Sequence, residues 1–186
     1  MKTYDTSNVR NVVLLGGPKA GKTLFAESMM FEGKVIERRG TIEGKNTMSD
    51  NTEIEQENQR SIYSTLLYTE FMDTKFNIID TPGSDDFVGG VYSAFTVCES
   101  GIMLVNSTQG VEVGTEIFTR QALKHKKQLT FAVSQLDHEK ADWHMTLESL
   151  KNVYGAKIVL VQYPINPGSS FDAFIDVLKM KMYHFK

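Results

Sequence analysis

The stretch VVLLGGPKAGKT, residues 12–23, limits the fold of this 186-residue chain more than any other feature. The apolar run at residues 12–15 predicts a short buried strand that begins near Asn11, and the two glycines that follow it end that strand. A helix is expected from about residue 22 to residue 31. A strand, a glycine-rich turn and a helix in this order are typical of a phosphate-binding loop.

Residues 16–23 match the pattern G-x-x-x-x-G-K-[ST], in which each position has a physical role. The glycines let backbone N–H groups converge on phosphate oxygens, and the start of the helix adds partial positive charge. Lys22 is expected to reach the terminal phosphates, and the Thr23 hydroxyl to coordinate Mg²⁺. The expected ligand is a nucleoside triphosphate with Mg²⁺, held by Gly16, Gly17, Pro18, Lys19, Ala20, Gly21, Lys22 and Thr23.

Further along the chain, the stretch NIIDTPGSDDF places a carboxylate and a Pro-Gly turn directly after an apolar run. A carboxylate at the end of a strand can hold Mg²⁺ through water, and a glycine beside it offers an N–H near the terminal phosphate. Asp80 is therefore expected to bind the metal, and Gly83 to contact phosphate. The residue after the glycine is Ser84, which raises the question of whether the protein hydrolyses its ligand or only holds it.

The rest of the chain alternates strand and helix patterns, which predicts an α/β fold with a mostly parallel sheet. Residues 62–71 and 76–79 are expected to form a hairpin. The other expected elements are helices at 87–98, 112–127 and 143–154 and strands at 101–106, 129–134 and 157–163. Residues 33–60 are polar with little apolar periodicity and predict a long mobile loop. Residues 171–185 fit a helix and a strand equally well, and periodicity leaves both open.

The composition of the chain limits the binding partners and the kinds of site that can be expected. The formal charge of −3 does not support broad electrostatic capture of nucleic acid or membrane, so no direct DNA contact is expected. The single cysteine, Cys98, excludes an internal disulfide and a multi-cysteine metal site, and it fits a reducing compartment. The N-terminus lacks the apolar centre of a secretory signal, and no segment is apolar over the length of a membrane span. A cytoplasmic monomer without membrane contact is expected.

In the stretches GGPKAGKT, IIDTPGSDDF and FDAFIDVLKMKMYHF, the chain resembles the nucleotide-binding domain of translational GTPases, most closely elongation factor G. EIEQENQRSIYS is similar to the end of that family's first switch segment, and residues 107–137 to its strand-helix-strand before the guanine-reading motif. Residues 163–185 resemble the start of the insertion that distinguishes elongation factor G. The resemblance covers nearly the whole chain.

The resemblance implies a P-loop GTPase fold, with helices on both faces of a mostly parallel sheet. It implies a GTP-binding core at residues 1–156 and the beginning of the insertion at 157–186. The family's closing strand and helix and its last guanine-contacting loop have no counterpart, so we expect a fragment of a longer protein. The ligands implied are GTP and GDP with Mg²⁺, and the partner implied is the ribosome.

Transferred by position, the family pattern gives roles to residues around the phosphates. Lys22 becomes the phosphate lysine, and Ser61 the switch hydroxyl that joins Thr23 and Asp80 at Mg²⁺. Ser84 stands where the family has a histidine that orients the attacking water, so Lys22 and Ser84 are the candidate catalytic positions. A serine is shorter than a histidine and cannot carry positive charge, which predicts slower hydrolysis.

The guanine-reading segment departs from the family as well. Asp137 corresponds to the aspartate that pairs with the guanine N1 and N2 donors, but SQLD replaces Asn-Lys-x-Asp. Gln135 can lay its stem along a base without the lysine's charge, and Ser134 lacks the asparagine's amide. Weaker GTP binding with reduced guanine specificity is expected; the alternative is that SQLD is an ordinary turn without base contact.

Three functions follow from the resemblance. The leading one is the GTP-binding domain of an elongation factor G-like translocation factor whose hydrolysis is weak or conditional. The second is a GTP-gated ribosome-binding module that leaves without hydrolysis, and the third is a ribosome-protection factor that evicts a bound drug. Under the first, Asp85 or Asp86 is a candidate to orient water in place of the missing histidine.

Overall fold

The computed structural model of the protein describes residues 2–185, apart from the side chain of Asp85. Two compact units make up the chain: one runs up to Leu104 and includes Val113–Ala132, and the other comprises Val105–Glu112 and the chain from Val133 onward. No helix within the described residues is long and apolar enough to cross a membrane.

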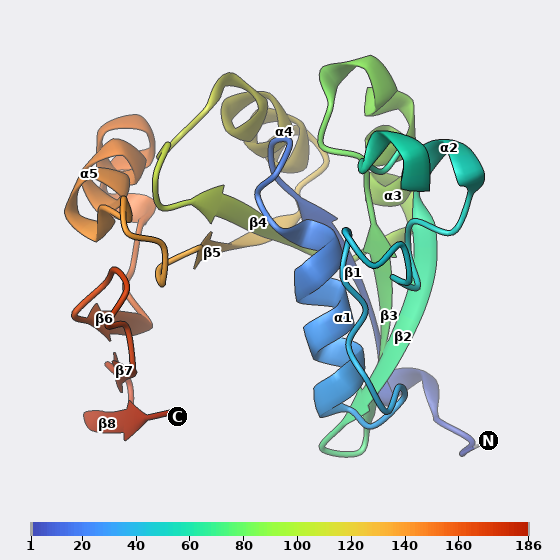
Figure 1. Ribbon diagram of the computed structural model, residues 1–186, viewed down its shortest axis with the longest axis horizontal. Helices are drawn as coiled ribbons and strands as arrows, with labels where there is room; N and C mark the ends of the chain where they lie inside the picture. Colours follow the sequence, from blue (N-terminus) through green and yellow to red (C-terminus); the bar gives the residue numbers. More distant parts are fainter. Residues whose placement is uncertain (1, 186) are drawn as a thin grey trace. The chain divides into compact units, whose positions relative to one another are not determined.

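Five α-helices and eight strands are assigned in the described residues (Figure 1). The helices are α1 (Lys22–Glu32), α2 (Glu53–Asn58), α3 (Val88–Val97), α4 (Val113–Lys124) and α5 (Trp143–Tyr154). The strands are β1 (Val9–Leu15), β2 (Thr65–Phe71), β3 (Thr74–Asp80), β4 (Ser100–Asn106), β5 (Gln128–Ser134), β6 (Gln162–Ile165), β7 (Ala173–Asp176) and β8 (Lys181–His184). Short 3₁₀ helices lie at Thr6–Asn8, Asp85–Phe87 and Gly155–Lys157.

The main sheet has the strand order β2-β3-β1-β4-β5. β1 runs parallel to both β3 and β4, whereas β2 pairs antiparallel with β3. The predicted hairpin is therefore confirmed, and its turn lies at Met72 and Asp73, which have positive φ angles of 47° and 58°. Two consecutive residues with positive φ suit the right-handed twist of a two-residue hairpin turn. The predicted α/β fold with a mostly parallel sheet is confirmed as well.

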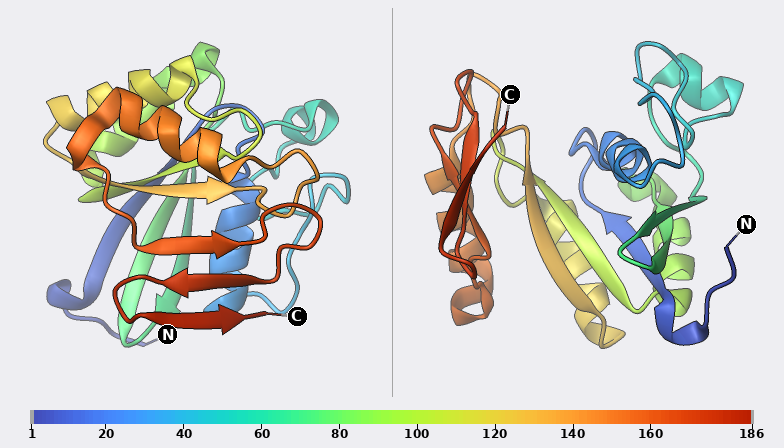
Figure 2. Two further views of the ribbon diagram at one scale, coloured as in Figure 1. Left: turned by 90° about the vertical axis from the view of Figure 1, so that its left-hand side faces the viewer. Right: turned by 90° about the horizontal axis from the view of Figure 1, so that it is seen from below.

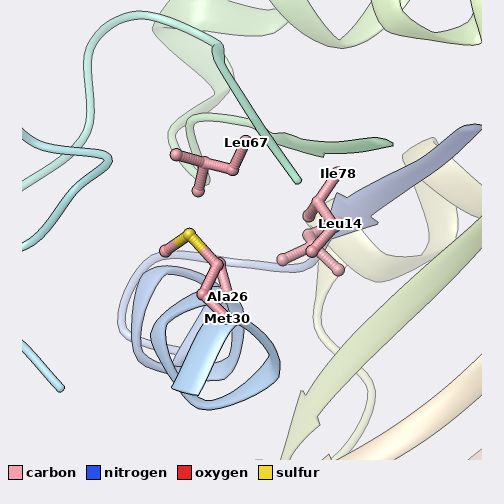
Figure 3. Packing of buried hydrophobic residues seen from close by; sticks show 5 residues of the cluster. All are labelled: Leu14, Ala26, Met30, Leu67 and Ile78. Carbon is pink, nitrogen blue, oxygen red and sulfur yellow. The ribbon is translucent and has the colours of Figure 1, made fainter. Parts of the chain in front are cut away.

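Helix α1 covers one face of this sheet, and α3 lies on the other (Figures 1 and 2). Figure 3 shows how α1 packs: Ala26 and Met30 face Leu67 of β2, Ile78 of β3 and Leu14 of β1. All five side chains are buried. Burial of a large aliphatic side chain contributes about 1.5–3 kcal/mol, so this contact fixes α1, and with it the turn before α1, against β1 and β3.

The long polar segment between α1 and β2 is hydrogen-bonded to α1 and to the sheet, and its predicted mobility stays a prediction. Glu27, buried on α1, accepts hydrogen bonds from the backbone N–H groups of Gly40 at 2.7 Å and Met48 at 2.5 Å. A buried carboxylate needs such donors, because an unpaired charge in the interior is strongly unfavourable. The segment also contains α2, which polarity alone did not predict.

Helix α2 begins with a capping box. Thr52 and Glu55 bond reciprocally at its start, and Glu55 Oε2 accepts the Thr52 hydroxyl at 2.6 Å. Glu55 Oε1 also accepts the N–H groups of Ile62 at 3.0 Å and Tyr63 at 3.1 Å. Burial acts to raise the pKa of Glu55, but these hydrogen bonds outweigh it and lower the pKa. The T-x-x-E spacing of residues 52–55 is typical of a helix start, although no helix was predicted from it.

The second unit holds a three-stranded antiparallel sheet with the order β6-β7-β8, visible in the left view of Figure 2. The strand predicted at 157–163 is wrong over most of its length, because β6 begins only at Gln162 and a 3₁₀ helix ends at Lys157. Of the two readings of residues 171–185, the strand pattern holds and the helical one is wrong. The division of the chain at residue 156 into core and insertion stays a prediction.

Replacing Glu55 with Ala should lower the free energy of unfolding by about 2 kcal/mol at neutral pH, because two partly buried N–H groups and the helix cap lose their acceptor. Urea unfolding followed by circular dichroism measures this. Because the folded-state pKa is lowered, the stabilisation is present at neutral pH and is lost as pH falls below the ordinary pKa of a glutamate and through the lowered one. Glu57→Ala, at an exposed position of the same helix, should change stability by less than about 0.5 kcal/mol; an equal loss in both variants would contradict this role of Glu55.

Candidate nucleotide and metal site

The turn after β1 has the backbone conformation that only glycine adopts easily. Gly16 has a φ of 142° and Gly21, directly before α1, a φ of 89°. A Cβ atom at Gly16 would lie 2.5 Å from the carbonyl oxygen of Leu104, so the neighbouring strand leaves no room for a side chain. Lys19 also has a positive φ, of 60°. The predicted phosphate loop is thus built as a tight turn between a buried strand and a helix start, the arrangement that binds phosphate.

Lys22 is buried at the centre of this turn. Its Nζ donates to the carbonyl oxygens of Gly16 and Gly17, both at 2.9 Å. Gly83, on the turn after β3, packs against the same place: a Cβ there would lie 2.6 Å from the carbonyl oxygen of Gly17 and would also collide with Lys22 Nζ. The structure therefore brings together Lys22 and Gly83, as the sequence predicted.

Asp80 lies at the end of β3 and is fully buried. Its Oδ2 accepts two hydroxyl groups, from Thr23 at 2.8 Å and from Ser49 at 2.6 Å. Burial raises the pKa of Asp80, and the hydrogen bond from Ser49, the charge of Lys22 and the hydrogen bond from Thr23 counteract this in part. Thr23 and Asp80 meet as predicted, whereas the contribution of Ser49 was missed.

A second carboxylate, Asp50, lies in the same interior. Among the described residues, neither oxygen of Asp50 has a hydrogen-bond partner, and Oδ1 of Asp80 has none either. Burial raises the pKa of Asp50, as do the nearby carboxylates of Glu55 and Glu27, whereas the Ser61 hydroxyl and the charge of Lys22 lower it. Two buried carboxylates with unpartnered oxygens and few cations near them fit a divalent metal with its bound waters. Asp50 gave no sequence signal, because its segment is polar without periodicity.

Ser61 completes the set of hydroxyl groups. Its Oγ lies 3.3 Å from Thr23 Oγ1, so the two hydroxyls predicted to bind Mg²⁺ are adjacent. The described residues contain no group of three or more His, Cys, Asp or Glu side chains that could enclose a metal. Hydroxyl and carboxylate oxygens with room for waters and phosphate oxygens are the donors that Mg²⁺ prefers. The residues present therefore fit Mg²⁺ bound together with a phosphate ligand.

Ser84 lies just before the 3₁₀ helix Asp85–Phe87 and is half-buried. Its hydroxyl donates to Oδ2 of Asp86 at 3.3 Å, a contact at the protein surface. The side chain of Asp85 lies outside the described part of the chain, so its predicted role has no structural counterpart here. A short hydroxyl engaged with a neighbouring carboxylate is a poorer water-positioning group than a histidine.

The predicted base-reading segment belongs to the second unit. Ser134 ends β5, and its hydroxyl donates to the carbonyl of Val105 at 3.3 Å. Gln135 has a positive φ of 56°, and its carbonyl accepts the Ser107 hydroxyl at 2.8 Å. Asp137 is exposed. A cavity of about 600 Å³ adjoins the segment and is lined by Val133, Gln135, Leu136, Asp137, Phe171, Asp172 and Phe185.

Asp137 and Ser134 differ in the hydrogen-bonding groups that they can offer to a ligand. Asp137 lines the cavity, and a carboxylate can accept two N–H donors of a base. The Ser134 hydroxyl already donates inside the protein. The weakness of Ser134 as a base contact and the base contacts themselves stay predictions.

A family model described as the elongation factor Tu GTP binding domain matches residues 7–183. An elongation factor G-like protein of Thermotoga maritima is 32% identical over 178 residues, which is 96% of this chain and 25% of that protein. Elongation factor G of Mycoplasma genitalium is 29% identical over 99% of this chain and 27% of its own length. A mitochondrial ribosome-releasing factor 2 of Danio rerio is 30% identical over 94% of this chain and 23% of its own length.

The fold agrees with these matches. A crystal structure of a Thermus thermophilus protein superposes with a TM-score of 0.91 at 27% identity, over 97% of this chain and 27% of that one. The chain spans about a quarter of the length of the curated relatives it matches. The family model covers most of the chain, including the phosphate loop and the turn at Gly83. The chain therefore belongs to the translational GTPases, as a GTP-binding domain of the elongation factor Tu type.

Proposed function

We propose that this domain binds GTP and GDP with Mg²⁺ and serves an elongation factor G-like protein that acts in translocation on the ribosome. The observation that carries the proposal is the joint position of Lys22 in the phosphate loop and of Asp80 beside Thr23. Family membership supports the guanine nucleotide, and the names of relatives from Thermotoga and Mycoplasma support an elongation factor G-type role. A location in the cytoplasm is part of the same proposal and rests on the names of the bacterial elongation factor G relatives.

Each residue has a role that follows from its chemistry. Backbone N–H groups of the turn bind phosphate oxygens, and Lys22 holds the terminal phosphates by charge. Thr23 and Ser61 offer hydroxyl oxygens to Mg²⁺, while Asp80 and Asp50 hold its waters. When bound, Mg²⁺ supplies positive charge that neutralises the phosphate oxygens during transfer to water. Asp137 accepts the N1 and N2 donors of guanine, a pair that adenine lacks.

Nucleotide state is coupled to the ribosome through the two segments that contact the phosphate site. Residues 40–61 reach Asp80 and Thr23 through Ser49 and Ser61, and the turn at Gly83 packs on the phosphate loop. Loss of the terminal phosphate removes contacts from both segments, as in GTPase switches generally. These segments are therefore the ones whose rearrangement changes affinity for the ribosome.

Ser84 favours a second candidate within the same family. A domain that binds GTP but lacks a water-positioning side chain can work as a GTP-gated binding module that leaves the ribosome without hydrolysis. The contact of Ser84 with Asp86 supports this reading, because it directs the hydroxyl to a surface carboxylate. The two candidates predict different phosphate release from GTP. The translocation factor releases phosphate slowly or conditionally, whereas the binding module releases none.

Lys22→Ala should weaken binding of GTP and of GDP about 100-fold, because a buried, charge-assisted contact worth about 3 kcal/mol is lost. Titration of the protein with a fluorescent GTP analogue in the presence of Mg²⁺ measures this. Lys124→Ala, in the last turn of α4, is the matched loss of one positive charge and should leave affinity unchanged. Similar affinities of the Lys22→Ala variant and the unmodified protein would refute the phosphate site.

Asp137→Ala should reduce the preference for GTP over ATP by about 10-fold or more, because guanine loses its paired acceptor. Competition between the fluorescent GTP analogue and either unlabelled nucleotide gives the ratio of affinities. Glu139→Ala removes a nearby exposed carboxylate and should keep the preference. A protein that prefers ATP before any change would show that the guanine assignment is wrong.

Ser84→His should accelerate phosphate release from Mg·GTP about 100-fold, the usual contribution of a positioned acid-base group. Single-turnover release is measured with the protein in its full natural length, with and without ribosomes, before and after the substitution. Slow or absent release before the change, together with GTP-dependent ribosome binding, is the expected result. A fast ribosome-stimulated burst from the unmodified protein would show that another group replaces the missing histidine.

A further inference from the structure

The hydroxyl of Ser49 reaches the candidate metal site from the long segment between α1 and β2. Ser49 is 1% exposed, and its Oγ donates to Asp80 Oδ2 at 2.6 Å. This is shorter than the 2.8 Å contact that Thr23 makes with the same oxygen. Hydrogen bonds from hydroxyl to carboxylate of this length are the strong, charge-assisted kind.

The backbone on both sides of Ser49 is held in place. Met48 N–H donates to the buried Glu27 on α1, and the carbonyl of Ser49 accepts the hydroxyl of Thr65, the first residue of β2, at 3.1 Å. The direction of the Ser49 side chain is therefore set by anchors on α1 and on β2. Because the Ser49 side chain is held from both sides, it can fix the orientation of its partner, the Asp80 carboxylate.

The two oxygens of Asp80 have different surroundings. Oδ2 accepts both hydroxyls, from Thr23 and Ser49, whereas Oδ1 has no hydrogen-bond partner among the described residues. Rotation about the last bond of an aspartate is soft, so the orientation of the carboxylate depends on its hydrogen bonds. Two donors on Oδ2 hold Oδ1 free for a water bound to a metal.

We infer that Ser49 is a positioning residue for Mg²⁺: by donating to Asp80 Oδ2, it orients the carboxylate toward the metal's waters and links residues 47–52 to metal binding. The inference rests on the proposed Mg²⁺-nucleotide site. The link is reciprocal, because a contact that orders the metal site also orders the segment that carries it. Thr23 lies on α1 and can keep its hydrogen bond to Asp80 while a lone pair of its hydroxyl binds the metal. Ser49 is the donor to Asp80 that comes from the long segment between α1 and β2.

The test compares Ser49→Ala with Thr65→Ala, which loosens the same backbone without touching Asp80. Each protein is loaded with a fluorescent GDP analogue, and the rate of nucleotide dissociation is followed while free Mg²⁺ is varied. Ser49→Ala should need about 10-fold more Mg²⁺ for half-maximal retention, the usual effect of losing a partner of a metal ligand. Affinity for nucleotide in excess EDTA should stay within about 2-fold, because the phosphate loop is unchanged.

Ser49→Thr keeps the hydroxyl and should return the Mg²⁺ midpoint to within about 3-fold of the unmodified protein. Amide hydrogen exchange over residues 47–52 supplies a readout without nucleotide or metal, and Ser49→Ala should accelerate it about 10-fold. An unchanged Mg²⁺ midpoint in Ser49→Ala, or equal shifts in Ser49→Ala and Thr65→Ala, would overturn the inference. Mg²⁺-independent retention by the unmodified protein would overturn the proposed function together with it.

Discussion

The buried carboxylate of Asp80 is the interaction on which the rest of the first unit depends. Removing a carboxylate from water costs several kcal/mol, so the fold must bring donors to it. Those donors come from α1 through Thr23 and from the long polar segment through Ser49, with Lys22 supplying positive charge. The end of β3, the start of α1 and the segment before β2 therefore meet at one point, which is also the point where phosphate and metal are expected.

The elements that were predictable from sequence are those whose signal is local. The apolar run before Gly16 gave β1, and the spacing of Trp143 and Leu150 gave α5 with the bounds that the structure has. α2 was missed because its six residues carry no apolar face; its stability comes from the capping box and from Glu55, whose partners lie beyond the helix. Residues 158–161 are apolar yet do not belong to a strand, because apolar content alone does not provide a pairing partner.

The residues of the candidate site also fall into those with a local sequence signal and those without one. Lys22, Thr23 and Asp80 lie in motifs whose spacing reflects chemistry, and the structure brings them together. Ser49 and Asp50 reach the site through a contact between distant parts of the chain, and single residues of a polar loop have no periodicity to show which way they face. Ser84 was recognisable only as a departure from a family pattern. Whether another side chain takes the place of the family's water-orienting histidine depends on side-chain geometry, which the sequence does not show.

The attachment of Glu27 to Gly40 and Met48 has a consequence for how the segment between α1 and β2 moves. One carboxylate closes a small inner loop within a long connection, and Glu55 closes another nearer to β2. The entropy of closing a loop grows only with the logarithm of its length, by about 0.6 kcal/mol per doubling, so several short closures are inexpensive to re-form separately. The two closures are held by different carboxylates, so the loss of one set of hydrogen bonds leaves the other loop closed.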